Sequence, residues 1–169
     1  MEPFVSIVIL NFNGANYLKT FLPSVLATSY QNKEIVVADN GSKDNSLAIC
    51  EELSRTYEKV SLYVHKNNQN KGASESRNLG ILKAKFDYNS FLDADDIMNF
   101  EHLAAQFKKL NGRKDSLASC AWGRFYNDDL DTIRFIPETV WQDLKPLDWI
   151  RKALIQKNDM MGVWLWLIP

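Results

Sequence analysis

Apolar and polar residues follow a repeating pattern over the first two thirds of the chain. Four apolar segments predict strands, at residues 5–10, 34–38, 60–65 and 90–92. Each of them is followed by a segment with apolar side chains at helical spacing, at residues 18–26, 47–57, 72–86 and 103–110. Strands that alternate with helices predict an α/β fold, with a mostly parallel central sheet covered by helices on both faces.

Two local features modify this picture. Pro23 lies inside the first helical segment, where its missing amide predicts a kink or a second helical segment. Asp44 or Asn45 is placed to cap the second helix.

The alternation ends after residue 111. Residues 117–122 and 132–136 predict strands around a polar turn at residues 127–129, and residues 146–155 predict a helix. The apolar residues 160–169 are typical of a buried strand, because an exposed tail of this kind promotes aggregation. No repeat or linker is present, so we expect one domain, and we expect the chain to stop before that domain is complete.

Composition narrows the class of protein. With 169 residues, 46% hydrophobic and 24% charged, the chain fits one soluble domain with a single core. A net charge of −1 gives no basic field, which argues against nucleic acid as a partner. No run approaches the roughly 18 apolar residues of a membrane span. Cys50 and Cys120 are isolated and fit free thiols in a reducing, cytoplasmic compartment, and His65 and His102 stand alone and are interpreted as structural.

Three polar segments follow the predicted strands. They are Asn11-Phe12-Asn13, Asp39-Asn40-Gly41-Ser42 and Asp93-Ala94-Asp95-Asp96. Loops at the carboxyl ends of parallel strands meet at one edge of a sheet, where ligands bind. Three carboxylates within four residues repel one another, and a hard cation such as Mg²⁺ or Mn²⁺ offsets that repulsion. The alternative is that Asp95 or Asp96 caps the next helix.

Single residues in and near these loops carry alternatives of their own. Phe12 is placed either to stack on a base or to pack in the core. Asp39 accepts a hydrogen bond from an imide N–H or serves as a turn carboxylate. Arg77 contacts the acidic loop or a phosphate, or forms a plain surface ion pair. The chain has no GxGxxG or GxxxxGK[ST] motif to hold a pyrophosphate with backbone amides.

Four motifs in order resemble glycosyltransferase family 2, which has the GT-A fold. They are VSIVILNFNGANYLKTFLPSVL, EIVVADNGSKDNS, NKGASESRNLGI and FLDADD. The resemblance implies a Rossmann-like sheet that binds a nucleotide-diphosphate sugar, usually a UDP-sugar, with Mn²⁺ or Mg²⁺. It implies inverting transfer of the sugar to a hydroxyl of a glycan, a lipid-linked acceptor or another acceptor. The full-length enzyme would be cytoplasmic, and peripheral association with the inner face of the cell membrane stays open.

Carried over by position, the resemblance assigns roles to single residues. Phe12 is similar to the base-stacking aromatic residue and Asp39 to the uracil-binding aspartate. Asp93 and Asp95 are similar to the DxD pair that contacts ribose and metal, and Asp96 can replace either as a metal ligand. The other residues expected around the nucleotide are Asn11, Asn13, Asn40, Gly41, Lys71, Arg77 and Ala94. Residues 1–111 would form the nucleotide-binding half and residues 112–169 the start of the acceptor-side half.

The resemblance also implies a general base, which we do not find in this chain. Family members carry an aspartate downstream of the DxD motif for this role. Nothing in the spacing of the downstream carboxylates Glu138, Asp143, Asp148 and Asp159 recommends one of them. A general base contributes about 10² to 10⁴ in rate. We therefore expect the base beyond residue 169, and a segment that binds donor but transfers little or no sugar.

Other classes of protein fit the residues less well. A nucleotidyltransferase usually has a glycine-rich, basic loop after its first strand, and Asn11-Phe12-Asn13-Gly14-Ala15 is different. A receiver-like signalling domain requires an aspartate after its third strand, where this chain has His65. A GT-A-like domain that binds nucleotide without catalysing transfer stays open as an alternative.

Overall fold

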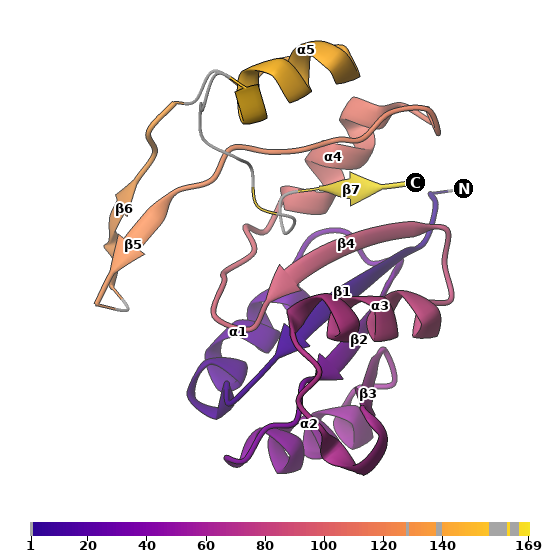
Figure 1. The fold of residues 1–169 in the computed structure, drawn as a ribbon, viewed down its shortest axis with the longest axis vertical. Helices are drawn as coiled ribbons and strands as arrows, with labels where there is room; N and C mark the ends of the chain where they lie inside the picture. The colour runs from indigo at the N-terminus through magenta and orange to yellow at the C-terminus, as the bar shows by residue number, and fades with distance from the viewer. Residues whose placement is uncertain (1, 128, 138–139, 156–161, 163–165) are drawn as a thin grey trace.

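The computed structural model describes residues 2–127, 129–137, 140–155, 162 and 166–169, and it has a central sheet with a separate small hairpin (Figure 1). The strands are β1 Val5–Asn11, β2 Lys33–Asp39, β3 Val60–Val64, β4 Tyr88–Asp93, β5 Arg124–Tyr126, β6 Asp129–Arg134 and β7 Leu167–Ile168. The helices are α1 Ala15–Ala27, α2 Ser46–Thr56, η1 Lys66–Asn68, α3 Ala73–Lys83, α4 His102–Leu110, α5 Pro146–Ile150 and η2 Arg151–Ile155.

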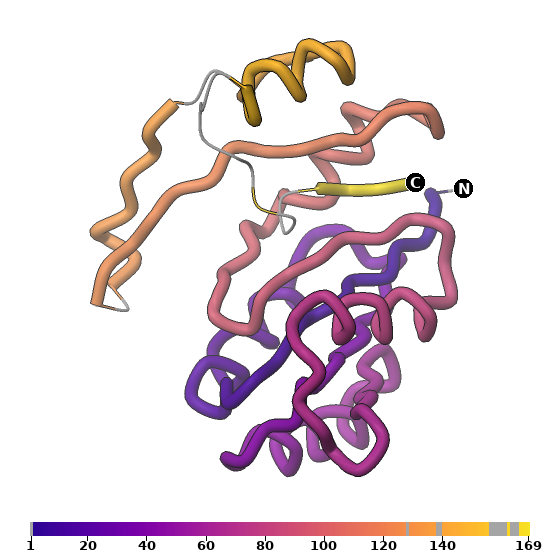
Figure 2. The backbone as a smooth tube through the Cα atoms, viewed as in Figure 1, coloured from indigo at the N-terminus to yellow at the C-terminus, as the bar shows by residue number. Residues whose placement is uncertain are grey.

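The central sheet has the strand order β3-β2-β1-β4-β7. The first four of these strands are parallel, and β7 adds to β4 in the antiparallel direction. Figure 2 shows this last strand, in yellow, running alongside β4. Helices lie on both faces, so the predicted α/β fold with a mostly parallel, helix-covered sheet is confirmed.

Side chains that alternate along β1 divide the core between the two faces of the sheet. Ile7 and Ile9 join the larger cluster, together with apolar residues of α1, α2 and α4. Val8 points to the other face, where it packs with Val36 and Phe91. Because both faces are covered, every residue of β2 is buried and β1 is almost entirely so.

A glycine lets α3 approach the second face closely. Gly80 is buried in α3, and a Cβ atom at this position would lie 2.2 Å from Cγ1 of Val8. No real Cβ atom tolerates that distance. The backbone of α3 therefore rests on β1 only because residue 80 has no side chain.

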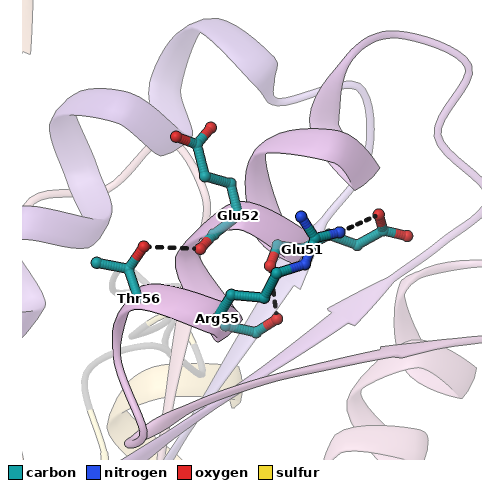
Figure 3. A network of polar contacts seen from close by, with 5 residues as sticks. Glu51, Glu52, Arg55 and Thr56 are labelled. Atoms are coloured by element: carbon teal, nitrogen blue, oxygen red, sulfur yellow. Dashed lines mark hydrogen bonds and ion pairs between the residues drawn. The ribbon is translucent and has the colours of Figure 1, made fainter.

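The outer face of α2 is polar and solvated (Figure 3). Arg55 forms an ion pair with Glu51 one turn earlier, at 3.4 Å, and the Thr56 hydroxyl donates to the Glu52 carbonyl at 2.9 Å. Both side chains of the ion pair are more than half exposed, so it contributes only about 0.3–0.5 kcal/mol. The stability of α2 in the domain comes from its opposite face, which buries Ile49 and Cys50.

Residues 117–122 do not form the predicted strand. In this segment only Ala118 is bridged, to Leu167, and the next strand starts at Arg124. Cys120 and Trp122 instead pack in a cluster with Val140, Ala153, Trp141, Trp149 and Trp166. The apolar pattern of the segment thus reflects packing of irregular chain rather than pairing in a sheet.

Other element boundaries differ from the predicted ones in detail. Helix α1 is one helix with Pro23 inside it, so the chain does not start a second segment there. Helix α3 ends at Lys83, and Phe86 stacks on Phe4 with ring centroids 4.7 Å apart. The hairpin strand β6 ends at Arg134, two residues before the predicted end.

The predicted helix at residues 146–155 is present as α5 followed by η2. Of the predicted strand within residues 160–169, residues 160, 161 and 163–165 lie outside the described residues, and β7 begins at Leu167. In the part of the chain that the structure describes, no helix has the length and apolar character needed to cross a bilayer.

Candidate nucleotide-binding site

The register of the sheet brings the three polar loops to one edge. Asn11, the last residue of β1, is paired with Asp39 at the end of β2, and Leu10 is paired with Asp93 at the end of β4. The loops that follow these strands therefore leave the sheet side by side. Their predicted convergence is confirmed.

Asp39 lies at the centre of this edge, fully buried. Its Oδ1 accepts hydrogen bonds from the amides of Gly41 and Ser42, at 3.0 and 2.8 Å. Its Oδ2 accepts from Nδ2 of Asn11 and from the Ser42 hydroxyl, both at 2.6 Å. Four protein donors thus use the acceptor capacity of the carboxylate. An imide N–H would have to replace one of them, and that contact stays a prediction.

Phe12 is directed toward solvent. Its side chain is 50% exposed, so the alternative that it packs in the core is wrong. The next residue, Asn13, has a left-handed backbone with φ of 51°. Its amide donates to the Ser42 hydroxyl at 2.8 Å, and its Oδ1 accepts from the Lys43 amide at 2.8 Å. An exposed ring on a loop held in this way offers a face for stacking.

Asn40 connects the second loop to the start of α3. Its Oδ1 accepts from the amides of Lys71 and Gly72, at 2.8 and 3.0 Å. Gly41 has φ of 81°, and a Cβ atom there would lie 2.6 Å from the backbone nitrogen of Asn70. Residue 41 must be glycine for the two loops to come this close. The side chain of Lys71 itself is exposed.

The acidic loop is held by Arg77 of α3. An Nη2 atom of Arg77 lies 2.8 Å from Oδ1 of Asp93, and the two side chains are only 22% and 26% exposed. The expected contact between Arg77 and the acidic loop is confirmed, and its partial burial sets it apart from a plain surface ion pair. Ala94 is buried, and its amide donates to the Leu10 carbonyl at 3.1 Å, which anchors the loop on β1.

The other two carboxylates of the loop differ from each other. Asp95 is exposed, whereas Asp96 is half-buried. Burial, together with the neighbouring charges of Asp95 and Asp93, raises the pKa of Asp96 to about 6. Helix α4 begins only at His102, with Glu101 as its N-cap residue, so the alternative that Asp95 or Asp96 caps this helix is wrong.

The donor atoms of the acidic loop fit a divalent cation of the magnesium type. They are carboxylate oxygens, which hard cations prefer. Among the described residues, no three His, Cys, Asp or Glu side chains converge into a preformed metal cluster. The acidic loop suits an ion that takes one or two carboxylates and completes its shell with water and phosphate.

Sequence reasoning underestimated two residues of the second loop. It did not assign Ser42 a role, although its hydroxyl contacts both Asp39 and the first loop. It proposed Asp44 as a cap of α2, but the carboxylate accepts from the amides of both Ala15 and Ser46, each at 3.0 Å, at the starts of α1 and α2. Although burial opposes it, hydrogen bonding from Ser46 and Ala15 holds the pKa of Asp44 below its ordinary value.

Both histidines contact other side chains of the fold, in keeping with their interpretation as structural residues. Nε2 of His65 lies 2.8 Å from the Ser76 hydroxyl, in a buried contact between the end of β3 and α3. Nδ1 of His102 lies 3.4 Å from Sγ of Cys120. Burial lowers the pKa of His102 to about 4 and raises that of Cys120 to about 12, so both groups are neutral near pH 7. Both cysteines are free thiols, as predicted.

The downstream carboxylates show no common placement. Asp143 is exposed and forms an ion pair with Lys109 at 2.8 Å. Asp148 is exposed in the first turn of α5. Glu138 and Asp159 lie outside the described residues. None of them is assigned as a base.

Comparison with solved structures identifies the fold. The mannosyltransferase PcManGT from Pyrobaculum calidifontis, in complex with GDP-Man and Mn²⁺, superposes with a TM-score of 0.63 over 71% of this chain and 36% of its own, at 21% identity. S. aureus TarS 1-349 in complex with UDP-GlcNAc has a TM-score of 0.54 over 64% of this chain and 32% of its own, at 27% identity. The fold is that of the GT-A glycosyltransferases.

Comparison of sequences gives the same result at higher identity. The glycosyltransferase GlyG of Streptococcus pneumoniae serotype 4 is 33% identical over 166 residues, which cover 97% of this chain and 52% of that protein. GlyA of the same organism is 32% identical over 123 residues, 73% of this chain and 17% of its own length. The chain thus spans about half of GlyG and less of GlyA. The model of the family "Glycosyl transferase family 2" matches residues 6–161, and the chain belongs to this family.

Proposed function

We propose that this chain forms the donor-binding part of a glycosyltransferase that uses a UDP-sugar. One observation carries the proposal: the exposed ring of Phe12 follows β1 and the acidic loop follows β4, and these two strands are neighbours in the sheet. A nucleotide bound across this edge would have its base near Phe12 and its diphosphate near Asp95. The GDP-Man of the PcManGT complex and the UDP-GlcNAc of the TarS complex support a nucleotide sugar as the donor.

The residues divide the work of binding. Phe12 stacks on the base. Asp39 holds the second loop, and an imide N–H of the base takes the place of one of its four protein donors. Arg77 fixes the orientation of Asp93, which contacts the ribose. Asp95 and Asp96 hold Mn²⁺ or Mg²⁺ through their carboxylate oxygens, because the third carboxylate of the loop, Asp93, is already paired with Arg77. The cation, when bound, supplies positive charge that stabilises the diphosphate leaving group.

The transfer reaction itself is an inverting one in this proposal. A hydroxyl of a glycan or of a lipid-linked acceptor attacks the anomeric carbon from the side opposite the diphosphate. The hydroxyl loses its proton to a general base that the described residues do not assign. We further propose that the whole enzyme works in the cytoplasm, where peripheral contact with the membrane would bring it to lipid-linked acceptors.

Calorimetric titration with UDP in Mn²⁺ tests the proposal. We expect wild-type protein to bind UDP only in the presence of the cation. Asp95→Ala should abolish this binding without a change in the circular dichroism spectrum, because Asp95 is exposed. Asp87→Ala is a matched control, since Asp87 is an exposed aspartate at the opposite end of β4. Equal UDP affinity in wild type and Asp95→Ala would refute the proposed role of the acidic loop.

A further inference from the structure

The Ser42 hydroxyl is the point at which the first two loops of the site are joined. Ser42 is only 3% exposed. Its Oγ donates to Oδ2 of Asp39 at 2.6 Å, and it accepts from the amide of Asn13 at 2.8 Å and from Nδ2 of Asn11 at 3.2 Å. One hydroxyl group therefore makes its full set of three hydrogen bonds, one of them to the last residue of β1 and one to the loop that follows it.

Other contacts of Ser42 extend this connection. Its amide donates to Oδ1 of Asp39 at 2.8 Å, and its carbonyl accepts from Nδ2 of Asn68, in η1, at 3.2 Å. The residue thus connects the segments that follow β1, β2 and β3. Because it is buried beneath them, its side chain is placed to hold these segments rather than to touch a ligand on their outer surface.

The bond from Asn13 to Ser42 has a consequence for Phe12. Asn13 adopts a left-handed backbone conformation, which asparagine reaches more readily than most residues but which still costs free energy unless specific contacts hold it. Two hydrogen bonds supply these contacts: the Asn13 amide donates to the Ser42 hydroxyl, and the Lys43 amide donates to Oδ1 of Asn13. The backbone at Asn13 fixes where the preceding residue projects, and that residue is the exposed Phe12.

We propose that Ser42 is a positioning residue for the donor nucleotide: it sets nucleotide affinity by holding the Phe12 loop, without touching the nucleotide. The inference rests on the proposed function, because it concerns the site described above. Loss of the hydroxyl leaves Asn13 free to relax from its left-handed conformation. The binding-competent loop is then one conformation among several, and apparent affinity falls with its population.

Ser42→Ala and a matched control, Ser6→Ala, test this role. Ser6 is also fully buried, and its hydroxyl donates to Oε1 of Glu34 at 2.7 Å and accepts from the Phe86 amide at 3.2 Å. Ser6 lies near the start of β1, at the end of the parallel strands opposite to the site. The two variants lose similar buried hydrogen bonds and should show similar losses in melting temperature. Only Ser42→Ala should raise the Kd for UDP in Mn²⁺, by about tenfold.

Two results would overturn the proposal: an unchanged Kd in Ser42→Ala, or an equal rise in Kd in Ser6→Ala. If Ser42→Ala does not fold, Ser42→Cys gives the same comparison, because a thiol is a weak hydrogen-bonding group of similar shape. Amide exchange of Asn13 separates this proposal from the proposed function. Ser42→Ala should accelerate that exchange and Ser6→Ala should not, even if the wild type binds no nucleotide. Unchanged exchange in Ser42→Ala contradicts the role of Ser42.

Discussion

The close approach of α3 to β1 predicts that Gly80→Ala destabilises the domain. The added methyl carbon would lie 2.2 Å from Cγ1 of Val8, whereas carbon atoms in contact are about 3.5–4.0 Å apart. The helix or the strand must therefore shift by more than about 1 Å. Val8 is fully buried between the two and cannot turn away into solvent.

Two opposing effects set the magnitude. Overpacking of a buried contact costs about 1–3 kcal/mol. Alanine favours a helix over glycine by about 1 kcal/mol, which offsets part of that cost. The methyl group here meets a branched side chain held by a buried strand, so we expect the upper part of the range and a net loss of about 1–2 kcal/mol. This is a large share of the 5–15 kcal/mol typical of a domain.

Urea denaturation measures this loss as a lower midpoint with an unchanged m value. The effect of Gly80→Ala should be smaller in a Val8→Ala background, because removal of the Val8 methyl groups makes room for the new one. Arg77 lies one turn before Gly80, so a shift of α3 should also weaken UDP binding. A Gly80→Ala variant as stable as the wild type would refute the argument, as would the same loss in both backgrounds.

Three further predictions concern the site and its surroundings. Phe12→Ala should weaken UDP binding by about 1–3 kcal/mol, the range for stacking of a base on an aromatic ring, and should leave the melting temperature unchanged. Tyr57→Ala removes another exposed ring and should have no effect on UDP binding. With the pKa of Asp96 at about 6, calorimetry should show that Mn²⁺-dependent UDP binding weakens as the pH falls below 6, because protonation removes a ligand charge, and Asp96→Asn should abolish this pH step. The pKa of His102 is lowered in the folded state from 6.5 to about 4, so its burial does not affect stability above pH 6.5 and reduces stability progressively as the pH falls toward 4. The urea midpoint of His102→Gln should therefore decline less than that of the wild type between pH 6.5 and pH 4, and an equal decline in both proteins would contradict the pKa assignment.

The fold and the position of the site follow from the sequence for physical reasons. Runs such as that at residues 5–10 predict buried parallel strands because both faces of such a sheet are covered. The parallel topology then brings the carboxyl ends of these strands together. The convergence of the polar residues that follow them can therefore be predicted without knowing any side-chain contact. The pairing of Arg77 with Asp93 could be anticipated in the same way, as charge compensation for an acidic loop.

Contacts between residues distant in sequence could not be predicted. Ser42 is a small polar residue whose partners in the first loop lie about 30 positions away, and nothing in its local pattern indicates them. The pairing of His102 with Cys120 depends on how irregular chain packs over α4. Residues 117–122 have a composition typical of a strand, but tertiary packing overrides that preference.

The edge strand β7 has a consequence for the order of folding. Leu167 pairs both with Ser90 of β4 and with Ala118, positions 77 and 49 residues earlier in the chain. The pairs β1–β2 and β2–β3 join residues 28 and 25 positions apart (Val5 with Lys33, Ile35 with Val60), whereas β1 pairs with β4 across 83 positions (Val5 with Tyr88). Loop closure costs more entropy at longer separations, so the pairings that β4 makes with β1 and with β7 are both expected to be slow. During synthesis, however, all residues of β1 to β4 emerge well before Leu167. The four parallel strands can therefore assemble first, which leaves the outer edge of β4 open to wrong partners until Leu167 arrives.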